Sequence, residues 1–236
     1  MKGRLLWPAL GALTVLSYNT WLCWRPLNGH PEIFDGYLSE LSATDQPYDL
    51  FFRGGDLVTA VILVALGLHA LRLWRHRGAW WTVAAAALLL FGVSTFLDSF
   101  LGMDCSPTLN EACRVAEATG QLSTAHYAHT VTSVGAQAGI VASMVASAIA
   151  LLRTPRRSRS RTRAVLVVAA VEVVALAVML VMIAADVPGL GYPQAAMVVV
   201  ASLWFAAIGF GLVGPDAGTR RDPALAGSTE LVGERG

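Results

Sequence analysis

Charged and polar side chains gather near the ends of three long apolar segments of this sequence. The set consists of Arg53, Asp56, Asp98, Ser99, His126 and His129. Two histidines three residues apart and one carboxylate form a ligand set that Zn²⁺ accepts, and an open fourth position is typical of a catalytic zinc site. Asp98, His126 and His129 are therefore candidate ligands of zinc, the one cofactor that the sequence brings into consideration.

The same residues allow two other interpretations. Ser99 with a histidine and Asp98 has the residue types of a Ser-His-Asp hydrolase, although the sequence offers no sharp turn that would present the serine and no oxyanion donors. The simplest interpretation is a structural network, because polar groups inside a membrane need a partner. Arg53 and Asp56 share a helix face at their spacing of three, and Asp49 is spaced to pair with Arg53.

The apolar segment that begins with the two histidines carries a polar stripe. Its members follow helical spacing and are His126, Thr130, Ser133 and Gln137. The stripe turns apolar at Ile140, so it extends about halfway along the segment. We expect this helix to be central, with the stripe either packed against neighbouring helices or lining a ligand cavity that opens outward.

A single acid, Glu172, lies deep within a later apolar segment. A carboxylate at such a depth is either a tolerated inward-facing group, with His69 as a possible partner, or part of a proton or ion relay. Both interpretations stay open at the level of the sequence.

Six apolar segments are long enough to cross a membrane, since about 20 helical residues rising about 1.5 Å each span roughly 30 Å. They are predicted at about 5–24, 50–74, 79–103, 124–152, 164–185 and 194–213. The runs are continuous rather than alternating, which indicates helices and not a barrel. We predict an all-α, polytopic membrane bundle of six transmembrane helices over residues 1–213, followed by a disordered cytoplasmic tail at 214–236.

The composition also favours a membrane protein. Hydrophobic residues make up 55% of the chain and charged residues 14%, whereas soluble domains carry about 25% charged residues. The formal net charge of +1 gives no reason to expect nucleic acid as a partner, so membrane lipids are the expected partners. One lysine against sixteen arginines is common where the genome is GC-rich, which favours a bacterial plasma membrane.

The distribution of basic residues predicts the orientation. Of the 17 lysines and arginines, only Arg25, Arg53 and Arg114 fall on the side opposite the N-terminus. The excess of positive charge marks the cytoplasmic side, so both termini are predicted to be cytoplasmic. We interpret the arginine-rich stretch at 153–163 as an inner loop that fixes this orientation, rather than as a patch for nucleic acid or anionic lipid.

Two outer loops carry further candidate residues. The stretch at 35–56 is polar, includes Ser39 and Glu40, and is expected to fold back onto the helix ends. Cys105 and Cys113 share the next outer loop. The space outside the membrane is oxidising, so we expect a disulfide between them. Zinc binding by both cysteines together with the histidine pair is the alternative.

Short motifs give a family resemblance. They are Leu38-Ser39-Glu40-Leu41, Pro47, Phe51-Phe52, Asp98, Cys105-Ser106-Pro107, Cys113, His126 and His129. Over about residues 5–213 the chain resembles a prokaryotic family of uncharacterised multi-pass membrane proteins with a domain of unknown function. That family is similar in turn to the DRAM, Frag and Sfk type of membrane protein. Ser42-Ala43 stands where a glycine is usual. The resemblance implies a six-helix integral membrane protein and brings no assigned reaction.

Three functions are compatible with these residues. The preferred hypothesis is a non-enzymatic bundle that binds lipid, senses or acts as a scaffold, with a polar cluster at the outer leaflet. It is preferred because it requires the fewest special roles of the residues. A metal-dependent membrane hydrolase would use Asp98, His126 and His129, and a small proton-coupled transporter would use Glu172. Whether the protein is an enzyme is left open by the sequence.

Overall fold

A computed structural model describes residues 3–154 and 158–215, and within these ranges the chain is helical with no strand. The α-helices are α1 (Gly3–Ser17), α2 (Trp24–Leu27), α3 (Asp49–Trp74), α4 (Ala79–Asp98), α5 (Glu111–Ala118), α6 (Thr124–Leu152), α7 (Arg159–Ala184) and α8 (Gly191–Gly209). Three short 3-10 helices are η1 (Thr20–Cys23), η2 (Pro31–Phe34) and η3 (Leu38–Ser42). Among the described residues five helices, α3, α4, α6, α7 and α8, are long and apolar enough to cross a membrane, whereas α1 is a shorter apolar helix.

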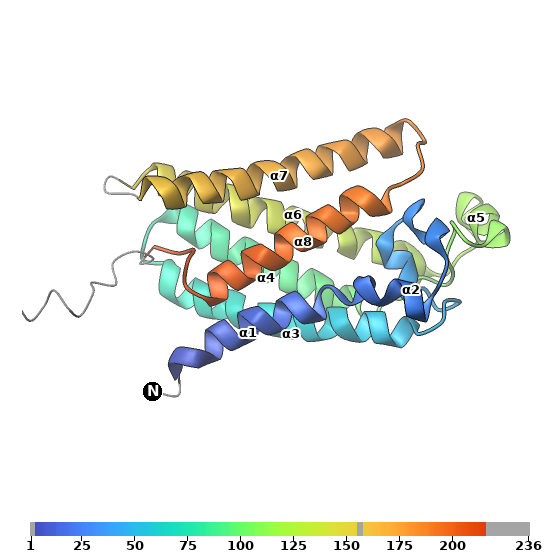
Figure 1. Ribbon diagram of the computed structural model, residues 1–236, viewed down its shortest axis with the longest axis horizontal. Helices are drawn as coiled ribbons and strands as arrows, with labels where there is room; N and C mark the ends of the chain where they lie inside the picture. The colour runs from blue at the N-terminus through green and yellow to red at the C-terminus, as the bar shows by residue number, and fades with distance from the viewer. Residues whose placement is uncertain (1–2, 155–157, 216–236) are drawn as a thin grey trace, which may run out of the picture.

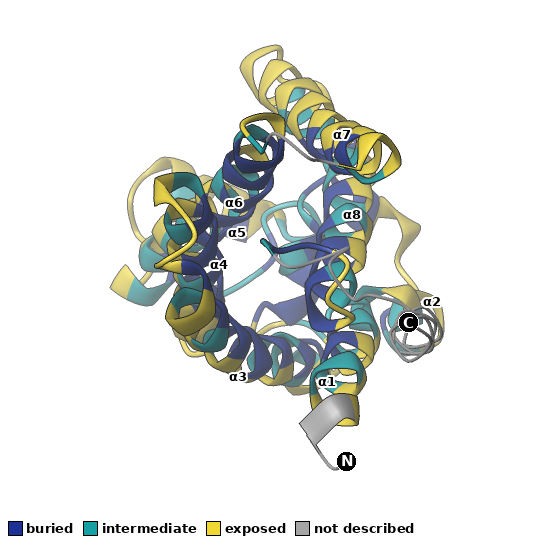
Figure 2. Ribbon diagram, turned by 90° about the vertical axis from the view of Figure 1, so that its left-hand side faces the viewer, coloured by how far each residue is buried: buried dark blue, intermediate teal, exposed yellow. Residues whose placement is uncertain are grey.

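The long helices and α1 stand side by side in a ring. Around the ring α1 is followed by α3, α4, α6, α7 and α8, and α8 returns to α1 (Figure 2). The start of α1 and the end of α8 lie at one end of the bundle, which we call the terminal end (Figure 1). The opposite end carries η2, η3 and α5, and we call it the capped end.

Glycines allow the closest approaches between helices of the ring. A Cβ on Gly139 of α6 would lie 2.7 Å from the backbone nitrogen of Phe91 on α4. A Cβ on Gly92 of α4 would lie 2.8 Å from the backbone nitrogen of Val64 on α3. Small residues let helix backbones meet in this way in membranes, where van der Waals packing drives association. The α3–α4–α6 side of the ring is therefore tightly packed.

Two hydrophobic clusters fill the molecule. The larger one fills the interior toward the terminal end, and its fully buried members include Leu63, Leu88, Ile140, Met144, Leu151, Trp204 and Phe205. The smaller one comprises Ile33, Phe34, Leu38, Leu41 and Phe52 at the capped end. It holds residues 28–48, which contain η2 and η3 and which we call the cap, against the ends of the helices.

The helices α1 and α4 end at least five residues earlier than the hydrophobicity predicts. The first segment was expected to stay helical to Trp24, but α1 ends at Ser17, where the Asn19 side chain donates to the Val15 carbonyl at 2.7 Å. The third was expected to reach Met103, but α4 ends at Asp98. Arg53 of α3 donates from Nε and Nη2 to the Ser99 carbonyl at 3.1 and 3.0 Å, so this oxygen is not used to extend the helix.

The agreement with the predicted boundaries varies among the other helices. α3 begins at Asp49, one residue before the predicted start, and α6 spans Thr124–Leu152 as predicted. α7 begins at Arg159 instead of residue 164, because Ser158 caps its first turn through the Arg161 amide. α8 is displaced toward the N-terminus and runs from Gly191 to Gly209 rather than over 194–213. Of the predicted tail, residues 216–236 lie outside the described part of the chain.

Candidate functional site

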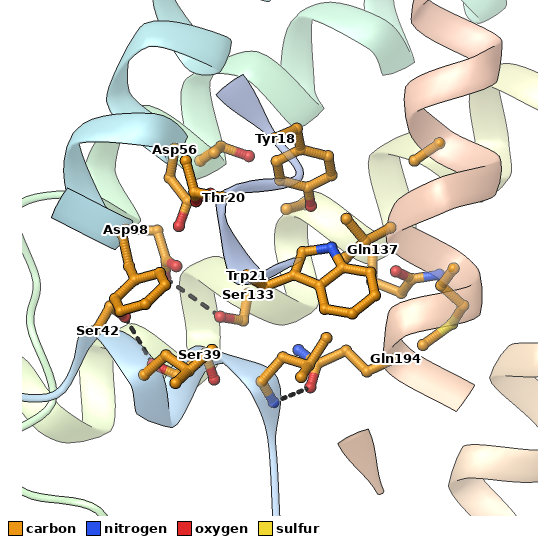
Figure 3. Close-up of a pocket in the computed structure, with 18 of the residues that line it drawn as sticks. Tyr18, Thr20, Trp21, Ser39, Ser42, Asp56, Asp98, Ser133, Gln137 and Gln194 are labelled. Atoms are coloured by element: carbon orange, nitrogen blue, oxygen red, sulfur yellow. Dashed lines mark hydrogen bonds between the residues drawn. The ribbon is translucent and has the colours of Figure 1, made fainter. Parts of the chain in front are cut away.

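A cavity of about 130 Å³ lies inside the ring, toward the capped end (Figure 3). Its polar lining consists of Tyr18, Thr20, Ser39, Ser42, Asp56, Thr95, Asp98, Ser133, Gln137 and Gln194. Its apolar lining includes Trp21, Leu38, Leu41, Phe52, Phe91, Ile140 and Met197. One water needs about 10–15 Å³ by this measure, so the cavity has room for a small molecule or a head group.

Helices of the ring, the segment after α1 and the cap all contribute to this lining. Asp56 lies on α3, Asp98 is the last residue of α4, and Gln137 lies in the middle of α6. Gln194 lies in the first turn of α8, and its Oε1 accepts from the Leu38 amide of the cap at 2.7 Å. The cap thus lies over the cavity at the ends of the helices, and one wall residue holds it there.

Asp98 is well supplied with hydrogen-bond donors. Its Oδ1 accepts from the hydroxyl of Thr132 and, at 3.2 Å, from that of Ser133. The Nδ1 atom of His129 lies 3.2 Å from the same oxygen and 2.9 Å from the Leu101 carbonyl. The predicted network of Asp98 with a histidine is therefore present, and the histidine is His129.

Asp56 is in the opposite situation. In the described part of the chain, no hydrogen bond or salt bridge reaches its carboxylate. Arg53 lies only one helical turn away but turns to the Ser99 carbonyl and, at 3.9 Å, to Asp49. The sequence placed Arg53 and Asp56 in one polar cluster, and the structure separates them into different environments.

The candidate zinc ligands do not converge on one point. His126 Nδ1 accepts from the Asp104 amide at 3.1 Å, and its Nε2 lies 3.4 Å from Glu117. Both ring nitrogens of His126 therefore point away from the Asp98–His129 pair. Among the residues that the structure describes, no group of three His, Cys, Asp or Glu side chains is arranged to hold a metal ion.

The Ser-His-Asp interpretation also lacks its geometry. The hydroxyl of Ser99 donates to the Thr95 carbonyl of its own helix at 2.9 Å. A nucleophilic serine needs a hydrogen bond to a general base instead. Ser99 therefore acts here in ending α4, together with Arg53.

The polar stripe of α6 is only partly as predicted. Ser133 and Gln137 line the cavity, whereas Thr130 is exposed and His126 faces α5 and the loop between α4 and α5. The hydroxyl that reaches Asp98 beside Ser133 belongs to Thr132. The polar face is therefore turned slightly from the one that the spacing of His126 indicated.

Glu40 anchors the cap from within. It is 2% exposed and accepts from Ser106 Oγ at 2.5 Å and from both the amide and the hydroxyl of Thr108, at 3.0 and 2.8 Å. It also accepts from the Tyr37 amide at 3.0 Å. Ser39, its neighbour, instead lines the cavity.

The loop that meets Glu40 is itself held in place. Cys105 and Cys113 form the predicted disulfide. Asp104 accepts from the hydroxyl and the amide of Ser123, both at 2.6 Å, and these hydrogen bonds lower the pKa of the Asp104 carboxyl. In the cap, burial raises the pKa of the Tyr37 phenol, and nearby carboxylates raise it further.

Glu172 is 1% exposed and is connected to the cavity through one residue. Gln137, which lines the cavity, donates to Glu172 Oε1 at 2.8 Å, whereas Oε2 is buried without a partner in the described structure. His69, the partner considered from the sequence, instead stacks on Trp7 with ring centroids 4.1 Å apart.

Several wall residues had no role in the sequence-based prediction. Tyr18 and Thr20 follow α1, and Thr95 precedes Asp98 by one turn of α4. Gln194 lies in the first turn of α8. The interruption of the first apolar segment by polar residues at 18–20 was the one signal that pointed to this wall.

Comparisons with known proteins define the family. Comparison with curated proteins and with solved structures gave no match. A family model described as "Protein of unknown function (DUF998)" matches residues 10–211. This range includes every helix from α2 to α8, the cap and the whole cavity lining. The chain therefore belongs to the DUF998 family of proteins of unknown function.

Proposed function

We propose that this protein is a non-enzymatic membrane bundle that binds a small polar ligand or a lipid head group in the cavity. The observation that carries the proposal is Asp56, a carboxylate in an apolar helix that lines the cavity and has no hydrogen-bond or salt-bridge partner in the described structure. A polar group at such a depth is costly unless something satisfies it. A bound ligand would supply what the fold does not.

The proposal includes a topology of six crossings with both termini in the cytoplasm of a bacterial cell. α1 would be the sixth span, since it lies between α3 and α8 in the ring and η1 and α2 lengthen its path. The arginine-rich ends of α3 and α6 lie at the terminal end, so the positive-inside rule makes this end cytoplasmic. The cavity would then belong to the outer leaflet, as in the six-helix layout that the DRAM, Frag and Sfk resemblance implies.

The surroundings of the cavity favour holding a ligand over passing it through the membrane. Toward the terminal end the ring is filled by buried side chains, among them Met144, Trp204 and Phe205. Toward the capped end the cavity is covered by η3. A site bounded by a packed core on one side and by a hydrogen-bonded cap on the other suits binding or sensing.

A cavity-filling substitution tests the proposal. Ala136 of α6 lines the cavity, whereas Ala138 on the same helix is exposed. Wild-type protein, Ala136→Leu and Ala138→Leu would be purified in mild detergent, and bound lipids and small molecules identified by mass spectrometry. Overpacking an occupied site costs about 1–3 kcal/mol, so Ala136→Leu should lower the bound ligand by roughly tenfold or more. Equal amounts of the same ligand in all three proteins would refute the proposal.

A proton-coupled transporter is the second candidate, because Gln137 links the cavity to Glu172. Glu172 would bind and release the proton, and the packed core would have to open during the cycle. In proteoliposomes Glu172→Gln should abolish proton uptake while the control Glu32→Gln, at an exposed site in the cap, leaves it unchanged. Equal uptake by both variants would reject this candidate.

A further inference from the structure

We propose that the ligand of the cavity carries an organic ammonium group whose counter-ion is Asp56. This inference rests on the proposed function and specifies its ligand class. It depends on three features of the lining: its acidic side chains, its unsatisfied acceptors and its aromatic walls.

In the described part of the chain, the lining contains acidic side chains and no basic ones. The described residues around the cavity include two carboxylates, Asp56 and Asp98, and no lysine, arginine or histidine. Three donors already converge on Asp98, one of them the histidine His129. Asp56 has no such support, so a cationic ligand beside it would supply the partner that the fold does not.

A second acceptor in the same wall also lacks a donor. Thr95 is 5% exposed and lines the cavity, and its hydroxyl oxygen is buried without a hydrogen-bond partner in the described structure. Asp56 lies on α3 and Thr95 on the neighbouring α4. A ligand with N–H or polarised C–H donors would satisfy both groups, whereas an anionic ligand would satisfy neither carboxylate.

Aromatic rings form much of the remaining wall and indicate what kind of cation fits. They are Tyr18, Trp21, Phe52 and Phe91. A cation over an aromatic face is attracted by the ring quadrupole, and quaternary ammonium groups are recognised in this way. Ca²⁺ would require six to eight oxygen ligands, and Mg²⁺ a near-octahedral set. A mixed wall of rings and two carboxylates therefore favours an organic ammonium ion over a metal ion.

A matched pair of probes separates charge from shape. Choline and its neutral carbon isostere 3,3-dimethylbutan-1-ol would be titrated by calorimetry into the full-length protein in dodecyl maltoside. We expect saturable binding of choline and binding of the isostere weaker by roughly tenfold or more, because the isostere lacks the charge–carboxylate and cation–π attraction. Equal binding of the two probes would overturn the inference.

Variants assign the effect to this site. Asp56→Asn should weaken choline binding by roughly tenfold or more and leave the isostere unaffected. Asp186→Asn, at an exposed position in the turn between α7 and α8, is the matched control and should bind choline normally. Unchanged choline affinity in Asp56→Asn would overturn the inference. If Asp56→Asn does not fold, Thr95→Val and the two probes on wild-type protein still decide the question.

The ammonium group can come from a free amine or from a lipid head group, and short-chain lipids distinguish the two sources. Tighter binding of dioctanoyl phosphatidylcholine than of choline assigns a lipid, and equal or weaker binding assigns a free amine. Dioctanoyl phosphatidylglycerol that binds as well as the choline lipid would overturn the inference. If neither probe binds but Ala136→Leu still loses a co-purified ligand, the ammonium assignment falls and the proposed function stands.

Discussion

The buried carboxylate of Glu40 should determine how firmly the cap closes the cavity. It joins η3 to the loop that the Cys105–Cys113 disulfide constrains, through hydrogen bonds from Ser106 and Thr108. The substitution Glu40→Gln keeps the size and shape of this side chain and removes its charge. It therefore tests the hydrogen bonds without creating a cavity.

The cost follows from how the four donors are shared. Oε1 accepts from the Tyr37 amide and the Thr108 hydroxyl, and Oε2 accepts from the Thr108 amide and the Ser106 hydroxyl. The side-chain nitrogen of a glutamine donates hydrogen bonds and cannot accept one. A hydroxyl can turn to accept from it, but one backbone amide must lose its acceptor on whichever side the nitrogen lies. Loss of a hydrogen bond to a charged group costs about 1.5–3 kcal/mol, so we expect about 2–3 kcal/mol for opening of the cap.

Hydrogen–deuterium exchange measures this opening directly. A factor of ten corresponds to about 1.4 kcal/mol, so the peptides that contain Tyr37 and Thr108 should exchange roughly 30- to 150-fold faster in Glu40→Gln. Glu32→Gln, an exposed position in the same cap, should exchange like wild type. Gly36→Ala is an independent perturbation, because its Cβ would collide with the Glu40 carboxylate and the Thr108 side chain.

Equal exchange of wild type and Glu40→Gln would refute the reasoning, since it would mean that these hydrogen bonds do not hold the cap. A rise confined to the peptides of α3 and α4 would also count against it, because the perturbation would then act on the ring and not on the cap. A faster rate at Tyr37 and Thr108 alone is the outcome that the structure supports.

Three further predictions follow from the packing and the electrostatics. Gly139→Ala should destabilise the bundle by about 1–3 kcal/mol in thermal unfolding, because the added methyl meets the backbone of α4, whereas Gly54→Ala meets nothing within 4 Å. The pKa of Asp104 is lowered in the folded protein, so its contribution to stability is complete above the ordinary value of about 3.9 and is lost as the pH falls through the lower folded value. Acid unfolding of Asp104→Asn should lack that contribution, and identical pH profiles would contradict it. Metal analysis should find the same zinc content in wild type and in a His126→Ala, His129→Ala double variant, and about one zinc per chain that the variant loses would instead establish the metal site.

Continuous hydrophobicity predicted the long helices because each can be recognised from neighbouring residues alone. Ser123 and Ser158 cap α6 and α7 through their own side chains, and Gly78 precedes α4 with a positive φ of 120°. These signals are local. The early end of α4 was not predictable in the same way, because it depends on Arg53, which reaches the Ser99 carbonyl from another helix.

The residues that line the cavity could not be predicted from the sequence for a related reason. The polar half of α6 indicated that a polar surface exists, and it correctly contained Ser133 and Gln137. Which helices face that surface depends on the order around the ring, where α1 follows α8 although they lie at opposite ends of the chain. Tyr18 and Gln194 therefore meet at one site without any spacing rule that relates them.

The polar residues singled out from the sequence differ in whether the fold gives them hydrogen-bond partners. Arg53 ends a helix, Glu40 holds the cap, and Asp98 gathers the donors of α6. Each of these meets, within the fold, the cost of placing a polar group among apolar helices. Asp56 alone among these four has no hydrogen-bond or salt-bridge partner in the described chain, and it lines a cavity where a ligand has room. A residue that served only in folding would be expected to have a partner, as the other three do, so the exception points to a bound molecule as the missing partner.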